Sequence, residues 1–230
     1  TGDHSSRDLL EACFMGAPYW AGHPGQSINY VSCHDNHTLF DRIALAAPEA
    51  PGDVLIRMNN LAAAFSILSQ GVPFFQAGEE MLRTKPSKKD KFDHNSYRSP
   101  DRVNSIKWET LDNPLYQKNV DYYKGLLRFR KAHPSLRLTS KKDVERCVHP
   151  IRYPNPHVAS FLVEEGPLEL MVIFNADTRS VYVPLPEGQW DVMIRDDIAG
   201  TFPLCSAEAA VQVPAISTMV LVHKKPIDVV

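Results

Sequence analysis

Residues 28–37 read INYVSCHDNH, a short apolar, β-prone run that ends abruptly in a polar cluster. The apolar side chains of residues 54–70 recur at three- and four-residue spacing, which predicts a helix with Asp53 as its N-cap. Gly71 is placed to end that helix, and residues 72–77, VPFFQA, predict a second buried strand. Strand, helix and strand in this order predict a βαβ unit with parallel strands.

The segments that follow extend this unit into a domain. Residues 83–113 are rich in Lys, Asp, Asn, Ser and Pro and predict a long irregular excursion, which in a compact domain is usually functional or disordered. Residues 115–133 carry an apolar stripe at helical spacing, and Pro134 stops the helix. We therefore expect residues 1–139 to form one domain that alternates strands and helices.

The pattern changes after about residue 139 to short runs of alternating polarity separated by turn residues. The expected strands are residues 159–163, 168–174, 180–185, 189–195, 210–213 and 216–222. The separators contain Gly, Pro, Asn and Asp, which supply the backbone conformations that tight turns need. The sequence thus predicts a second domain, residues 140–230, built as an antiparallel β-sandwich.

Composition excludes several classes of protein. The 230 residues are 43% hydrophobic with a net charge of −2, which is typical of a folded chain and gives no reason to expect nucleic acid as a partner. No apolar run approaches the roughly 20 residues that span a bilayer, so no membrane association is expected. The four cysteines form no CxxC pair that could hold zinc or carry out redox exchange, and no cofactor is expected. Because the chain does not begin with Met, we expect a piece of a longer protein.

The densest chemical cluster is residues 32–38, SCHDNHT, at the end of the first predicted strand. In a barrel of parallel strands, the side chains at the carboxyl ends of the strands line the active site. Asp35 could bind two hydroxyls of a sugar ring there or offset positive charge in an oxocarbenium-like transition state, and His34 could donate to another hydroxyl. From the residues alone, two other interpretations remain open. Asp35 and Asn36 could merely satisfy turn backbone, or His34, Asp35 and His37 could ligate a metal.

Several stretches resemble the α-amylase superfamily of glycoside hydrolases (family 13), and in their extended forms they look most like type I pullulanases. Residues 30–36, YVSCHDN, are similar to the family's motif at the end of barrel strand seven, and residues 71–80, GVPFFQAGEE, to its strand-eight motif. The remaining matches are residues 95–101 (NSYRSPD), Val103-Asn104, Trp108 and residues 130–134 (RKAHP). The resemblance implies the last part of a (β/α)8 TIM barrel, strands seven and eight with their helices, followed by a C-terminal β-sandwich.

The resemblance also implies roles for residues. Asp35 corresponds to the carboxylate that stabilises the transition state, and His34 to the donor that binds a substrate hydroxyl beside it. Asn36 is expected to hold the turn and to contact substrate, and Tyr97 and Arg98 of the long loop could flank the sugar subsites. The implied substrates are α-glucans, namely pullulan and branched maltooligosaccharides, cleaved at α-1,6 bonds with retention. Glu79 and Glu80 are expected to make structural hydrogen bonds or to pair with Arg83.

The chain departs from the family pattern in one respect that decides the mechanism. The nucleophile and the acid/base carboxylate of the family stand on barrel strands four and five, in motifs of the type Gly-Phe-Arg-x-Asp, and no such segment occurs here. We therefore expect the isolated chain to be inactive and to need the remainder of a barrel, or self-association, to cover its strand edges. The alternatives are an α-1,4-acting enzyme of the same superfamily and a non-catalytic carbohydrate-binding or interaction fragment.

Overall fold

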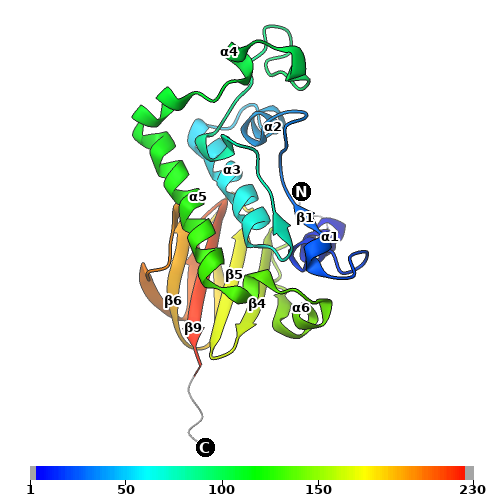
Figure 1. Ribbon diagram of the computed structural model, residues 1–230. Helices are drawn as coiled ribbons and strands as arrows, with labels where there is room; N and C mark the ends of the chain where they lie inside the picture. The colour runs from blue at the N-terminus through cyan, green and yellow to red at the C-terminus, as the bar shows by residue number, and fades with distance from the viewer. Residues whose placement is uncertain (1–3, 226–230) are drawn as a thin grey trace, which may run out of the picture.

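The computed structural model describes residues 4–225, so the expectation that rests on Thr1 lies outside them. Its helices are α1 (His4–Phe14), α2 (Leu39–Ala46), α3 (Gly52–Leu68), α4 (Asp101–Asn104), α5 (Pro114–Ala132) and α6 (Lys141–Cys147). Its strands are β1 (Ile28–Asn29), β2 (Val72–Pro73), β3 (Val148–Ile151), β4 (Val158–Glu165), β5 (Leu168–Asn175), β6 (Val181–Asp196), β7 (Ile198–Ala199), β8 (Cys205–Val213) and β9 (Ser217–Lys224). In Figure 1, α2, α3 and the upper part of α5 lie above the large sheet, α6 lies beside it, and the segment around α4 forms the far end of the molecule. Within residues 4–225, no helix is both long enough and apolar enough to cross a bilayer.

The predicted βαβ unit is present, and its two strands are parallel. Ile28 pairs with Val72 and Asn29 with Pro73, and the chain between them forms α2 and α3. Each strand is only two residues long, shorter than the sequence predicts, because the pair has no third strand among the described residues to extend its ladder. Ile28 is 60% exposed on this small sheet, which leaves apolar surface uncovered.

The helix that follows the first predicted strand differs from the sequence expectation at its start. Pro51 is the N-cap of α3, so the prediction that Asp53 holds this position is wrong. Asp53 lies instead in the first turn, where its carboxylate is favoured by the helix dipole. The other end of α3 is fixed by Arg130 of α5, which donates to the carbonyls of Ile67, Ser69 and Gly71 at 2.7–2.9 Å.

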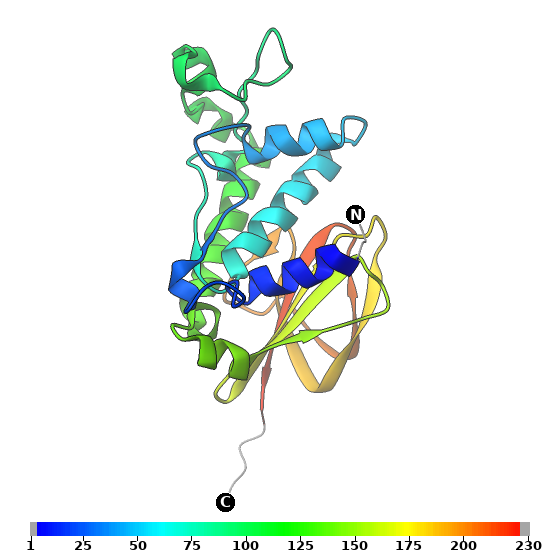
Figure 2. The same ribbon diagram turned by 90° about the vertical axis from the view of Figure 1, so that its right-hand side faces the viewer.

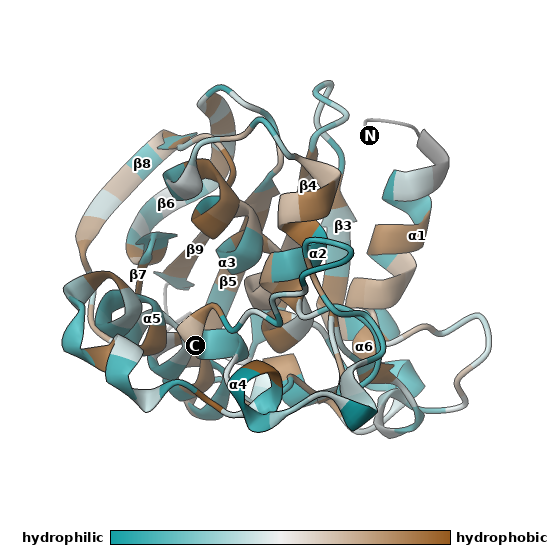
Figure 3. Cartoon of the chain, turned by 90° about the horizontal axis from the view of Figure 1, so that it is seen from above, coloured by the Kyte–Doolittle hydropathy of each residue, from teal (hydrophilic) through white to brown (hydrophobic). Residues whose placement is uncertain are grey.

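The large sheet is antiparallel throughout, in the order β3-β4-β5-β9-β6-β7, with β8 paired to β6. Two strands that the sequence separates, residues 180–185 and 189–195, are one long strand, β6, whose register shifts between Pro184 and Gln189. The shift replaces the predicted turn, because a β-bulge bends a strand without ending it. Strands β3 to β9 therefore form a single hydrogen-bonded sheet, in which β6 pairs with both β9 and β8. Figure 3 shows that much of the loop chain on this side of the molecule is in the hydrophilic colour.

Apolar residues are buried on both faces of this sheet. On one face, α1, α3 and α5 pack against it, and the Phe14 and Phe161 rings are stacked with centroids 3.8 Å apart. On the other face, Trp190 of β6 is fully buried and packs in a cluster with Met171 of β5, Val211 of β8 and Met219 of β9. Figure 2 shows the helices gathered on one side of the strands. The helical part and the sheet thus share one core, which fixes the position of the helices.

Candidate functional site

The loop between β1 and α2 carries three of the predicted site residues, His34, Asp35 and Asn36, and borders a groove. The groove is lined by Tyr30, Val31, Ser32, Cys33, Asp35, Asn36, His37, Arg42 and His94. Thr38 ends the loop as the N-cap of α2, where its hydroxyl accepts the backbone N–H of Asp41 at 3.2 Å. Asp35 is therefore one of the residues that line a groove beyond the end of β1.

Asp35 and His34 are neighbours on the open side of this loop. The distance between His34 Nε2 and Asp35 Oδ2 is 3.4 Å, and both side chains are mostly exposed, at 85% and 73%. Asn36 follows with a φ of +63°, a left-handed conformation that Asn tolerates better than most residues. The turn thus exposes a carboxylate and an imidazole side by side, although His34 itself is not among the residues that line the groove.

A buried network anchors the start of the loop. The Ser32 hydroxyl donates to Glu79 Oε2 at 2.5 Å, and the Tyr123 hydroxyl of α5 donates to Glu79 Oε1 at 3.2 Å. Asn59 of α3 donates in turn to the Tyr123 hydroxyl at 3.2 Å. Burial raises the pKa of Glu79 to about 7, and the hydrogen bonds from Ser32 and Tyr123 oppose that rise. Glu79 therefore connects the loop that carries Asp35 to α5 directly and to α3 through the Tyr123 hydroxyl.

A second buried contact anchors the end of the loop. The Lys85 ammonium donates to the Asn36 carbonyl, and the Lys85 backbone N–H donates to Asp41 Oδ2 at 2.8 Å. Burial is the main cause that lowers the pKa of the Lys85 ammonium, and the nearby Arg83 charge adds to it. The carboxylates of Asp93, Asp41 and Asp35 oppose this decrease. The loop that carries Asp35 is thus held at both ends by groups from the segment after β2.

The expectation that Glu79 and Glu80 make structural hydrogen bonds agrees with the geometry. Glu80 Oε2 accepts the backbone N–H of Gly78 at 3.0 Å, while Glu79 holds Ser32 and Tyr123. Arg83 pairs with neither carboxylate and donates to the carbonyls of Ala77 and Asn104 instead.

The long segment contributes a different residue to the groove from those predicted. Tyr97 and Arg98 lie in a 3-10 turn outside the groove lining, Tyr97 is 73% exposed, and the Arg98 guanidinium lies 5.2 Å from its ring centre. His94 of the same segment lines the groove, with its ring 5.8 Å from that of His37. The sequence does not predict that His94 lines the groove, because an irregular segment has no periodicity that indicates which side chain turns inward.

The groove has limited chemical capacity. Asp35 is the single carboxylate among the described residues that line it, whereas a retaining glycosidase needs two carboxyl groups about 5–5.5 Å apart across the scissile bond. Within residues 4–225, no three His, Cys, Asp or Glu side chains are placed to hold a metal ion. The residues that line the groove thus offer one carboxylate, together with imidazole, hydroxyl and amide groups that can form hydrogen bonds with a polar ligand.

Comparison with known proteins gives a consistent answer. No family model matches the chain. The pullulanase of Bacillus subtilis (strain 168) is 35% identical over 167 residues, which is 71% of this chain and 22% of that protein. The structure of pullulanase from Bacillus acidopullulyticus superposes on 97% of this chain and 27% of its own length, with a TM-score of 0.89 and 32% identity. A pullulanase from an Anoxybacillus strain, crystallised with maltotetraose, covers 96% of this chain and 31% of its own length, with a TM-score of 0.84 and 29% identity.

The chain thus spans between a fifth and a third of the length of each of these relatives. Each relative is a pullulanase, and the likeness in structure extends over nearly all of the described residues. The chain accordingly matches pullulanases consistently, and the partial coverage of each relative agrees with a C-terminal portion of a pullulanase-like enzyme.

Proposed function

We propose that this chain is part of a retaining glycoside hydrolase that debranches α-glucans by cleaving α-1,6-glucosidic bonds. The observation that carries the proposal is the exposed Asp35 carboxylate in a groove at the end of β1, beside His34 and on a loop anchored at both ends. The family of the relatives and the maltotetraose bound to one of them support an α-glucan, such as pullulan or a branched maltooligosaccharide, as substrate.

In this proposal β1 and β2 are the seventh and eighth strands of a TIM barrel within residues 1–139, and residues 140–230 form the C-terminal β-sandwich domain. The parallel pairing of β1 with β2, with helices between them, supports the barrel assignment. Exposed Ile28 and Val72 on the small sheet leave an edge for the rest of the barrel, or for a second copy of the chain, to cover.

Asp35 acts as the residue that stabilises the transition state. Its carboxylate would bind two ring hydroxyls and offset the positive charge that develops at the anomeric carbon, while His34 donates to a third hydroxyl. Anchoring by Glu79 and Lys85 places the carboxylate before substrate arrives, so little reorganisation is needed during the reaction. Asn36 contacts substrate from the same turn, and Tyr97 and Arg98 contact more distant sugar units.

Because the groove holds one carboxylate, the nucleophile and the acid/base come from a preceding part of the barrel. The isolated 230-residue chain should therefore release no reducing sugar from pullulan, whereas the complete enzyme should hydrolyse pullulan faster than amylose. Preference of the complete enzyme for amylose would instead support the α-1,4-acting alternative.

A calorimetric titration separates the catalytic proposal from the binding-module alternative. Maltotetraose should bind the 230-residue chain through the groove, so the Asp35→Ala variant should bind it more weakly. Binding that is unchanged by Asp35→Ala would place the glucan contact elsewhere and favour a binding module.

A further inference from the structure

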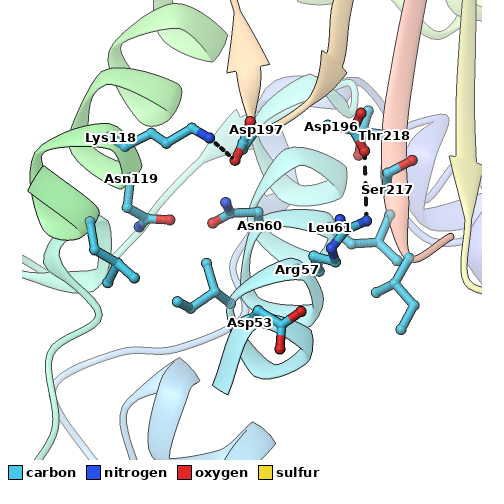
Figure 4. Close-up of a pocket in the computed structure, with 13 residues that line it drawn as sticks. Asp53, Arg57, Asn60, Leu61, Lys118, Asn119, Asp196, Asp197, Ser217 and Thr218 are labelled. Atoms are coloured by element: carbon cyan, nitrogen blue, oxygen red, sulfur yellow. Dashed lines mark ion pairs between the residues drawn. The ribbon is translucent and has the colours of Figure 1, made fainter. Parts of the chain in front are cut away.

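A second pocket lies where α3 and α5 meet the large sheet. It encloses about 230 Å³ between α3, α5, the end of β6 and the start of β9. Figure 4 shows side chains from these elements converging on it. No residue of the proposed glucan groove contributes to its lining.

Two buried amides in this pocket have unused hydrogen-bonding capacity. Asn119 is 3% exposed, and its Nδ2 donates to the Glu80 carbonyl at 2.8 Å, but its Oδ1 has no partner among the described residues. Asn60 is 4% exposed, and its Oδ1 accepts a long hydrogen bond of 3.4 Å from Asn59. Figure 4 shows the amides of Asn60 and Asn119 pointing toward one another. An unpartnered buried carbonyl oxygen is costly, so the pocket favours a molecule that can donate to Asn119.

The charges around the pocket are largely neutralised within it. Lys118 lies 2.5 Å from Asp197, and Arg57 lies 3.7 Å from Asp196 (dashed lines in Figure 4). Asp53 adds one further carboxylate at the exposed start of α3. An anion would meet three carboxylates and two cations that are already paired, so the pocket does not favour anions.

Size and apolar surface complete the description of the ligand. The volume is below the roughly 300–1,000 Å³ of sites for drug-sized molecules, so it suits a group of about one sugar ring. Leu61, Leu115 and Ile216 supply apolar surface for the C–H faces of such a ring. We propose that this pocket binds one small neutral polyhydroxylated molecule, such as a single hexose, whose hydroxyls bond to Asn119 and Asn60. This binding is separate from the proposed cleavage of glucans and does not depend on Asp35.

The test is a titration of the 15N-labelled 230-residue chain with D-glucose, followed through the side-chain amide signals of Asn60 and Asn119. Sodium sulfate and methylammonium chloride at the same concentrations serve as the anionic and cationic probes. Leu115→Trp fills the pocket from its rim, because Leu115 lines it and is 47% exposed. Leu127→Trp is the matched control, since Leu127 lies on the same helix, is 38% exposed and lines no part of this pocket.

Glucose should shift both amide signals in a saturable way, and sulfate and methylammonium should not. Leu115→Trp should weaken glucose binding at least about tenfold and Leu127→Trp less than about twofold, with both variants giving the dispersed spectrum of the parent chain. Unshifted amide signals at high glucose, equal binding by the two Trp variants, or shifts caused by an ionic probe and not by glucose would each overturn the proposal. Unchanged glucose binding in Asp35→Ala distinguishes this pocket from the groove.

Discussion

Glu79 should make the stability of the chain fall as the pH rises through neutrality. The carboxyl is 4% exposed, and burial raises its pKa to about 7, compared with 4.5 for an ordinary Glu. Because the folded state holds this proton more tightly than the unfolded state, the stabilisation is complete below about pH 4.5 and is lost as the pH rises through about 7. A rise in the pKa of Glu79 from 4.5 in the unfolded chain to about 7 in the folded chain corresponds to roughly 3 kcal/mol in the free energy of unfolding.

Glu79→Gln removes this titration and keeps the size and an acceptor oxygen for Tyr123. The difference in the free energy of unfolding, variant minus parent, should therefore be about 3 kcal/mol larger at about pH 8 than at about pH 4. Urea unfolding at intervals across this range measures the difference, with Glu80→Gln, which removes a carboxylate from the same turn, as the control. A difference between Glu79→Gln and the parent that stays constant with pH would show that the carboxyl is not desolvated as described.

Three further substitutions test the fold and the anchoring of the loop. Lys85→Met removes the donor to the Asn36 carbonyl and should weaken the loop by about 1.5–3 kcal/mol, seen as faster amide hydrogen exchange at residues 33–38; unchanged exchange would contradict the anchor. Gly125→Ala would place a Cβ against the Ala199 carbonyl oxygen and should cost about 3 kcal/mol, so a melting temperature equal to that of the parent would refute the contact between α5 and β7. Phe14→Ala removes a fully buried ring stacked on β4 and should cost about 3–5 kcal/mol in urea unfolding, whereas a loss below about 1 kcal/mol would mean that α1 does not join the core.

Periodicity in the sequence predicts those elements whose residues decide their own structure. The apolar spacing in residues 54–70 and 115–133 predicts α3 and α5 to within a few residues. Alternating polarity likewise predicts β4, β5 and β9. The length of β1 and β2 is not predicted, because the length of a short strand depends on the strands that pair with it. Paired only with one another, β1 and β2 are two residues long each.

In the candidate site, residues that are adjacent in the sequence could be predicted, and residues that reach the loop from distant segments could not. Asp35 and His34 follow one another in the sequence, so a strand followed by a polar loop is sufficient to place them together. Lys85 and Glu79 reach that loop from 49 and 47 residues away, and side chains at such separation are brought together by tertiary packing alone. His94 enters the groove from an irregular segment for the same reason.

The rate of pullulan hydrolysis by the complete enzyme with Asp35→Asn tests whether this carboxylate acts in the reaction. This substitution removes the charge and keeps the shape of an exposed side chain, so the fold should remain intact by circular dichroism. Asp90→Asn, at an exposed position of the long segment that lies outside the groove, is the control. Loss of the stabilising carboxylate should lower kcat by roughly three orders of magnitude or more, while the control keeps the parent rate. A decrease of less than about tenfold in a folded Asp35→Asn enzyme would contradict the role of Asp35 in the reaction.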